Sequence, residues 1–304
     1  MKIKNRSRIC LIISAAIIAV ALLLTAFGYG INLGIDFAGG LSMQYRLTDK
    51  TPVDKAVVEK VLDNMSIKTY TVTVQGADNN EVNIRIKDAS QDEQHVIKAN
   101  FENAVAEFYP DVFTYSDSSN IAFVGPVAGA ELTKNAILSV LIASALMLIY
   151  IAFRFDLNSG LAAVFGLVHD VLIMLSFMVI FRSVIQMNSS FIAAALTIVG
   201  YSINNTIVIF DRIRENAKKM PNAEREEVSN VSVRESLGRT VCTTITTLIT
   251  IVALCILGVA SIREFALPII VGILSGVYSA NMINPYVWAF LEKKRIARKA
   301  GKKA

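Results

Sequence analysis

Six long apolar segments constrain the fold of this chain more than any other feature. They cover residues 9–28, 136–153, 161–181, 191–210, 241–259 and 265–291. An α-helix of about 20 apolar residues can cross the hydrocarbon core of a bilayer. The chain is 54% apolar and only 18% charged, which lies outside the soluble globular balance. The sequence therefore predicts a polytopic α-helical membrane protein with six transmembrane helices.

Lysine and arginine residues are unevenly distributed among the connecting segments. The leader, the turn at Arg154, residues 212–239 and the tail from Lys293 hold 19 of the 30. These regions alternate along the chain, and basic residues favour the cytoplasmic side, so both termini are predicted to be cytoplasmic. The first segment follows a basic leader but is too long for a signal peptide and has no small-residue cleavage site, so we interpret it as a retained anchor.

The region between the first two segments is predicted to form an acidic extracytoplasmic α+β domain, with 15 acidic and 9 basic residues over 30–134. Strand patterns occur at 40–47, 69–74, 82–86 and 112–123. A helix is expected after Thr51, the predicted cap, with Pro52 at its first position. The capping box that begins at Ser90 predicts a second helix, ending near Phe108. This order of elements is ferredoxin-like.

The predicted organisation has four parts. They are the leader with helix 1 at 1–29, the domain at 30–134, helices 2 to 6 at 135–292 and a basic cytoplasmic tail at 293–304. Two glycine motifs flank the domain, and their members are Gly34, Asp36, Gly39, Gly40, Gly125, Pro126 and Gly129. Glycine permits tight turns, so these motifs are either simple connectors or hinges on which the domain moves.

His169 and Asp170 lie near the middle of the third apolar segment. An aspartate there costs about 2.5–3.5 kcal/mol on insertion scales, so it requires a partner or water. Two interpretations stay open: a structural hydrogen-bonded pair between helices, or a proton relay, because both side chains can titrate. The other histidine lies outside ligand spacing, so no metal site is expected.

The fourth segment contains polar residues at membrane depth, Asn204, Asn205 and Thr206, and it closes with Asp211 and Arg212. Such groups are expected to face other helices, a wet cavity or an ion path.

The fifth segment starts at Arg239 and carries a polar stripe at helical spacing, formed by Thr243, Thr246 and Thr250. The threonines either bond to their own helix while Arg239 reaches the interface, or the stripe forms a polar path facing Asn204 and Asn205. Gly272 and Gly276 form a GxxxG pattern, which favours close helix packing.

Three motifs together resemble the SecF subunits of the SecD/SecF protein-export family, in the RND superfamily. They are GIDFAGG at 34–40, VHD at 168–170 and GYSINNTIVIFDRIREN at 200–216. On this chain the family's motif residues fall on Gly34, Asp36, Gly39, Gly40, Gly125, Pro126, Gly200, Tyr201, Asp211 and Arg212.

The resemblance implies a multi-pass subunit of the bacterial plasma membrane, without enzymatic activity or a cofactor. With SecD and the SecYEG channel it would use the proton or sodium gradient to move secreted chains after SecA has pushed them, with YajC as a further neighbour. The alternative is an RND-type efflux or lipid transporter subunit, although such pumps normally contain two six-helix halves. A hydrolase is disfavoured, because the motifs of serine and zinc hydrolases are absent from the sequence.

One residue departs from the family pattern. Many SecF chains carry an aspartate for proton coupling where this chain has Asn205, whereas Arg239 matches the arginine of the next helix. An amide cannot titrate. Either SecD supplies the essential carboxylate, or Asp170 contributes, or the coupling ion differs.

Overall fold

Six helices of the computed structural model are long and apolar enough to span a bilayer, as predicted. The structure describes residues 3–47, 52–75, 79–87, 89–109, 121–183, 185–258 and 260–301. The first five spanning helices are α1 (Ile3–Ala26), α5 (Pro126–Arg154), α6 (Leu157–Ile180), α7 (Ser189–Lys219) and α8 (Arg225–Leu257). The sixth is continuous through α9 (Ala260–Tyr278), a π-helical turn η1 (Ser279–Ile283) and α10 (Asn284–Gly301).

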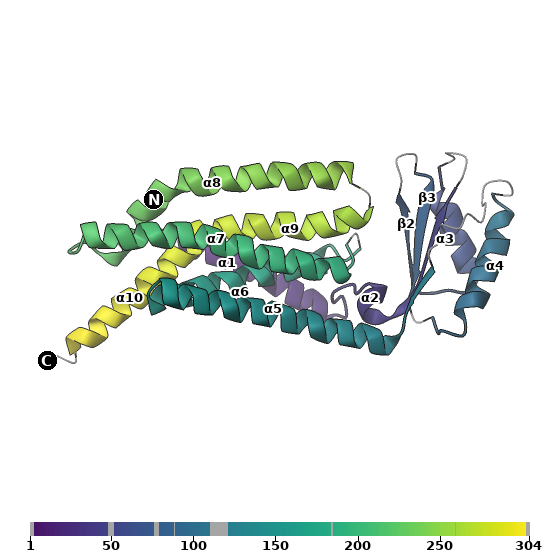
Figure 1. The fold of residues 1–304 in the computed structure, drawn as a ribbon, viewed down its shortest axis with the longest axis horizontal. Coiled ribbons are helices and arrows are strands. Elements are labelled where there is room, and N and C mark those ends of the chain that lie inside the picture. The colour runs from purple at the N-terminus through teal and green to yellow at the C-terminus, as the bar shows by residue number, and fades with distance from the viewer. Residues whose placement is uncertain are drawn as a thin grey trace.

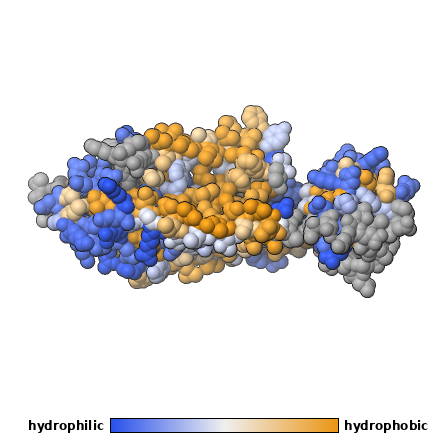
Figure 2. Space-filling view, turned by 90° about the horizontal axis from the view of Figure 1, so that it is seen from above, coloured by the Kyte–Doolittle hydropathy of each residue, from blue (hydrophilic) through white to orange (hydrophobic). Residues whose placement is uncertain are grey.

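Helices α6, α7 and the α9–α10 segment form the interior of the bundle. At least half of the most apolar stretch of each is buried. The most apolar stretches of α1, α5 and α8 are only 11% buried, so these helices lie at the periphery of the bundle. Figure 2 shows hydrophobic surface over the helices, between a hydrophilic end and the α+β domain. This band is the surface that a bilayer would cover.

Helices α7 and α8 are longer than the apolar segments that predicted them, with 31 and 33 residues. The charged region at 212–239 is therefore helical except for the short turn between Lys219 and Arg225, and does not form a long loop. In Figure 1 these two helices and α10 extend away from the α+β domain.

The α+β domain has the predicted order of elements. They are β1 (Gly40–Arg46), α3 (Lys55–Asn64), β2 (Tyr70–Gln75), β3 (Glu81–Ile86), α4 (Gln94–Ala106) and β4 (Ile121–Val124). The sheet order β2-β3-β1-β4 is antiparallel throughout and matches the ferredoxin-like split unit. Its core is closed by α3 and α4, whose buried residues include Leu62 and Phe101 (Figure 1).

One local prediction in this domain is corrected. The first helix begins at Lys55 and not at Pro52, because Asp54 is its cap and accepts a hydrogen bond from the amide of Ala56 at 2.9 Å. The last strand was predicted over 112–123, and the described part of it, β4 (Ile121–Val124), is a strand, whereas residues 112–120 lie outside the described residues. The capping box is confirmed: the Ser90 amide donates to Glu93 and the Glu93 amide donates to Ser90.

The first glycine motif forms a short helix, α2 (Ile35–Ala38), which the sequence did not predict. Gly40 follows with a φ of +134°, a conformation that favours glycine. A Cβ at Gly129 would lie 2.7 Å from the carbonyl oxygen of Phe37, so only glycine lets α5 approach α2 this closely. The two motifs therefore pack against each other where the domain joins the membrane helices.

The domain also contacts the ends of the spanning helices directly. Arg85 on β3 lies 3.0 Å from Glu264 on α9, and both side chains are largely buried, with 15% and 13% exposure. Gln186 accepts from Arg85 at 3.2 Å and donates to Thr71 at 2.6 Å. These contacts connect the sheet to α9 and to the α6–α7 connection.

Candidate functional site

Asp170 lies in the centre of the bundle with an exposed fraction of 0%. Its Oδ1 contacts His169 Nδ1 at 2.9 Å and Ser275 Oγ at 2.7 Å. Its Oδ2 contacts Ser202 Oγ at 2.5 Å and Ser279 Oγ at 2.8 Å. Helices α6, α7, α9 and η1 therefore converge on one carboxyl group, which satisfies the requirement that a membrane-embedded aspartate has partners.

A chain of hydrogen bonds connects this carboxyl group to the first helix. His169 Nε2 lies 2.7 Å from Ser14 Oγ on α1, and Ser14 Oγ lies 2.9 Å from the hydroxyl of Tyr278. The Tyr278 hydroxyl donates to the carbonyl oxygen of Cys10. Since α1 leads directly to the α+β domain, the site is in contact with the helix that carries that domain.

The GxxxG pattern is what lets the helices approach. A Cβ at Gly272 would overlap Ile198, and one at Gly276 would lie 3.3 Å from the Cα of Ser202 and 3.7 Å from Asp170 Oδ2. The close packing of α9 on α7 is confirmed, and it brings the Ser202 hydroxyl to the carboxyl group.

A second polar layer lies beside the first. Asn284 donates to Thr206 at 2.9 Å, and Thr240 donates to Asn281 at 3.3 Å, all four side chains being buried. It involves α7, α8, η1 and α10, so polar groups cross the whole interior of the bundle at this level.

Apolar clusters lie on both sides of the polar layers. Toward the α+β domain the cluster includes Met174, Met178 and Phe191. Toward the other end it includes Leu167, Ile209, Phe210, Ile213 and Trp288. In this conformation the carboxyl group is enclosed, so an ion can reach it only when helices move.

Asn205 on α7 and Arg239 on α8 were expected to face each other. Among the described residues no hydrogen bond connects their side chains. Asn205 is buried, with 5% exposure, and its side chain has no hydrogen-bond partner in the described part of the chain. Asn204 and Arg239 are both exposed. Helices α7 and α8, which carry Asn204 and Arg239, are neighbours in the bundle.

The threonines of α8 bond to their own helix, which was one of the two interpretations. Thr243 donates to the carbonyl of Arg239 at 2.8 Å. Thr246 donates to the carbonyl of Thr243, and Thr250 donates to that of Thr246. All three side chains are nevertheless exposed. Together with Arg239 they form an outward polar face on α8, and Asn204 is exposed on the neighbouring helix α7.

The remaining motif residues have structural positions. Asp36 accepts a hydrogen bond from the Ser189 amide at 2.7 Å and so caps the start of α7. Asp211 lies 3.4 Å from Arg154, and Arg212 contacts Glu215 and Glu235, each at 2.6 Å, at the opposite end of the bundle. Tyr201 packs against the cluster of α7 and α9 that includes Ile269. Asp36, Asp211 and Arg212 hold the ends of α7, Tyr201 packs at its middle, and none of them forms a hydrogen bond with Asp170 among the described residues.

Sequence reasoning missed the groups that surround Asp170, namely Ser14, Ser202, Ser275, Tyr278 and Ser279. A signal was present, because Ser275 and Ser279 are four residues apart and so share one helix face. No cluster of histidine, cysteine and acidic side chains suited to a metal ion occurs within the described residues.

Comparison with known proteins identifies the chain. Residues 104–294 match the family described as protein export membrane protein SecD/SecF, C-terminal. Residues 26–50 match the SecD/SecF GG motif. The chain belongs to the SecD/SecF family.

Individual relatives agree with this assignment. The protein translocase subunit SecF of Rickettsia bellii is 37% identical, with 88% of this chain and 86% of that protein covered. That of Helicobacter pylori is 34% identical, with coverages of 91% and 83%. The crystal structure of SecDF from Thermus thermophilus superposes with a TM-score of 0.76 at 31% identity. This chain is covered to 95% and spans 38% of the SecDF chain.

The resemblance noted from the motifs is thus confirmed, as are the six-helix architecture and the role in protein translocation. The chain is a SecF-type, multi-pass protein of the bacterial inner membrane, and its family serves protein translocation.

Proposed function

We propose that this SecF-type subunit assists protein export through SecYEG by coupling it to the proton gradient, and that the His169–Asp170 pair is its proton-binding group. The supporting observation is the complete burial of Asp170 among hydroxyl groups from three other parts of the bundle. The chain provides no titratable side chain at Asn205, so the proton must be bound elsewhere.

Counting protons along the hydrogen bonds supports this assignment. Tyr278 has one hydroxyl proton and donates it to the Cys10 carbonyl. Its contact with Ser14 therefore requires that Ser14 donates its own single proton to Tyr278. Ser14 then has no proton for His169, so His169 Nε2 must donate to Ser14. This count of donors supports a proton on Nε2.

A second proton must lie between His169 Nδ1 and Asp170 Oδ1, because two lone pairs at 2.9 Å would repel. It belongs either to an imidazolium facing a carboxylate or to a carboxylic acid facing a neutral imidazole, and the pair has zero net charge in both cases. On this proposal the observed contacts correspond to the proton-loaded pair.

Release of this proton would change the contact with α1. The remaining imidazole proton would move to Nδ1 to face the carboxylate, and Nε2 would become an acceptor. Ser14 would then turn its hydroxyl toward His169, and its hydrogen bond to Tyr278 would be lost. Proton binding and the attachment of α1 to α9 are coupled in this way.

Partners are proposed from the surface. Arg239, Asn204 and the α8 threonines are polar groups that would face lipid on an isolated bundle, where a charged residue is costly. We infer that SecD covers this face with a second six-helix half. The family resemblance adds YajC as a further neighbour and SecA as an indirect partner.

We also propose that both termini lie in the cytoplasm, because basic residues favour that side of the membrane. A self-contained efflux or lipid transporter is disfavoured by this uncovered face, and no catalytic activity is assigned.

The test is export into vesicles reconstituted with the cognate SecD and SecYEG. Asp170→Asn should abolish the dependence of export on an imposed proton gradient while ATP-driven export continues. Asn205→Ala, the comparison, should retain the gradient dependence, because its side chain has no hydrogen bond to lose among the described residues. Retention of proton dependence in a correctly assembled Asp170→Asn complex would refute the assignment.

A further inference from the structure

A pocket of about 560 Å³ lies at the end of the bundle away from the α+β domain. It is an open pocket, lined by the turn between α5 and α6 and by parts of α7, α8 and α10. Five of its lining side chains are cationic and two are acidic. The export mechanism proposed above does not use it.

Both acidic side chains of the pocket already have partners. Glu292 is 7% exposed, accepts a hydrogen bond from Asn158 at 2.6 Å and lies 2.8 Å from Arg295. Asp156 accepts from the hydroxyl of Ser159. Of the five cations, Arg295 is therefore balanced inside the pocket, and Arg154 is balanced by Asp211 outside it.

Three cations of the pocket lie outside its ion pairs. Arg214, Lys218 and Arg225 form no ion pair with any residue that the structure describes, and Arg214 donates only to the carbonyl of Arg154 at 3.4 Å. Arg214 and Lys218 are four residues apart on α7 and so lie on one face. Asp156 is the one carboxylate of the pocket lining outside an ion pair, so the lining keeps a net positive charge that favours an anion.

An unsatisfied donor lies in the same pocket wall. Trp288 is 5% exposed, and its indole Nε1 meets no acceptor in the described ranges of the chain. Trp288 lines the pocket beside the cations, so its ring forms part of the pocket wall.

The position of the pocket indicates where the anion comes from. The α5–α6 turn that forms its edge carries Phe153 and Leu157, which are 89% and 70% exposed. Both are exposed apolar side chains at the end of the bundle away from the α+β domain. Figure 2 shows hydrophobic surface over the helices meeting hydrophilic surface toward that end. The pocket therefore lies where the headgroups of a bilayer would be, beside a surface suited to acyl chains.

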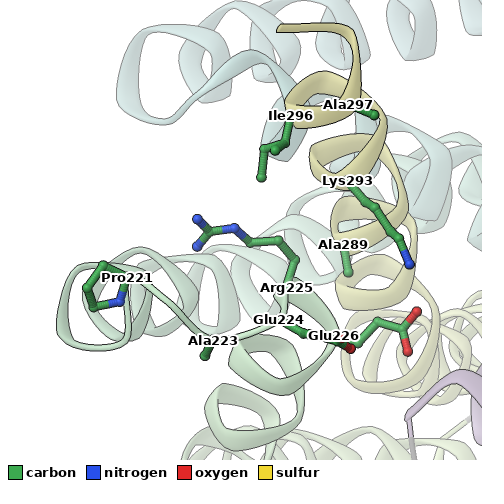
Figure 3. A pocket seen from close by; sticks show the side chains of 9 residues that line it. All are labelled: Pro221, Ala223, Glu224, Arg225, Glu226, Ala289, Lys293, Ile296 and Ala297. Carbon is green, nitrogen blue, oxygen red and sulfur yellow. The ribbon is translucent and has the colours of Figure 1, made fainter. Parts of the chain in front are cut away.

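A neighbouring pocket of about 440 Å³ provides a contrast. It lies between α10 and the turn at Pro221, and Arg225 extends into it from the start of α8 (Figure 3). Two cations and two carboxylates line it, namely Lys293 and Arg225, which borders both pockets, with Glu224 and Glu226. This balanced pocket has no excess positive charge, so the anion is expected in the first one.

We propose that the pocket formed by Arg214, Lys218, Arg225 and Trp288 binds the phosphate group of an anionic phospholipid headgroup. Basic pockets between membrane helices at the bilayer surface are typical sites for such lipids. A soluble phosphate compound offers the same charged group, but it has no acyl chain to contact the exposed apolar residues beside the turn.

The experiment measures phosphatidylglycerol retained by the full chain after exchange into detergent, by native mass spectrometry. The double variant Arg214→Gln with Lys218→Gln should lower the affinity roughly 30-fold, the effect of removing two cations at a membrane surface. The control variant Lys294→Gln with Arg298→Gln removes the same charge, at the same spacing, from α10 outside the pocket. It should retain the lipid like the unchanged chain.

Two further arms identify the source of the phosphate. Phosphatidylcholine should not be retained, and excess glycerol phosphate should not displace bound phosphatidylglycerol. Displacement by glycerol phosphate would overturn the lipid assignment in favour of a soluble ligand. Equal loss in the pocket variant and the control would show attraction by general charge and refute a specific pocket. Unfolding temperatures in pure phosphatidylcholine would show that both variants fold.

Discussion

Gly276 lies so close to Ser202 that a Cβ added to it would stand 3.3 Å from the Ser202 Cα, a distance that real Cβ atoms rarely adopt. The backbones of α9 and α7 are therefore in direct contact at the level of Asp170.

The first prediction follows from this contact. Gly276→Val should separate α9 from α7, remove the Ser202 hydroxyl from Asp170 and lower both the unfolding temperature in detergent and gradient-driven export. Gly200→Val is the matched control, because a Cβ at Gly200 meets nothing within 4 Å. Equal effects of the two variants would show that bulk on α7 or α9, and not this contact, is responsible.

A second prediction concerns the hydrogen bond that ties the proton site to α1. Tyr278→Phe removes the acceptor of the Ser14 proton, so Ser14 should donate to His169 Nε2 and favour an imidazole that accepts there. Nitrogen NMR of labelled histidine should show a larger fraction of the Nδ1-protonated neutral form than in the unchanged chain at the same pH. His95 lies in the α+β domain and supplies an internal reference, whose signal should not change. An unchanged His169 spectrum would contradict the proton count.

The third prediction concerns the attachment of the α+β domain. If the glycine motifs act as hinges, which is one of their two interpretations, the Arg85–Glu264 contact must break, since its partners lie on the domain and on α9. Arg85→Gln should broaden the distance distribution between spin labels placed on α4 and on the start of α5. Arg46→Gln is the control, because its ion pair with Glu81 lies within the sheet. A narrow distribution in both variants would mean that the packed glycine motifs alone hold the domain.

A fourth prediction concerns pH and the start of α4. Hydrogen bonds from the amide and side chain of Ser90 hold the pKa of Glu93 below its ordinary value of 4.5. A depressed pKa in the folded state stabilises the fold above the unfolded value, and this contribution is lost as pH falls through the folded one. Hydrogen exchange, corrected for its intrinsic rate, should therefore show the first turn of α4 opening more readily below about pH 4.5. Glu93→Gln should be insensitive to pH in this range.

Partner coverage of the outward polar face is tested by cross-linking. A cysteine at Thr246 on α8 should form cross-links with SecD in membranes that contain both subunits. A cysteine at Leu146 on α5, which is 62% exposed on an apolar helix, should react with lipid-soluble reagents but not with SecD. The reverse pattern would place the partner on α5.

The parts of the fold that the sequence predicted depend on local patterns. Apolar length is sufficient to identify spanning helices, and alternation with a capping box is sufficient to order the α+β domain. The beginning of α3 was misplaced because Thr51-Pro52 and Asp54 are competing start signals, and only the structure shows which side chain accepts the amide of Ala56.

The candidate site was predictable only in part. His169 and Asp170 stand out because ionisable residues are rare in apolar segments, whereas serines are common there and often bond to their own helix. Ser14 and Tyr278 are 264 positions apart, so no local pattern relates them. The Arg85–Glu264 contact is equally non-local, and it depends on how the domain docks on the helices.

The continuity of α9, η1 and α10 has a mechanical consequence. Glu264, Ser279 and Glu292 all belong to this one segment, which reaches roughly 40 Å from the first to the last at the rise of an α-helix. Glu264 holds the α+β domain, Ser279 contacts Asp170, and Glu292 lies in the charged pocket. Any twist of this rod about its own axis must displace all three groups together, unless the π-helical turn at Ser279–Ile283 absorbs it. The π-helical turn therefore determines whether α9 and α10 rotate together or independently.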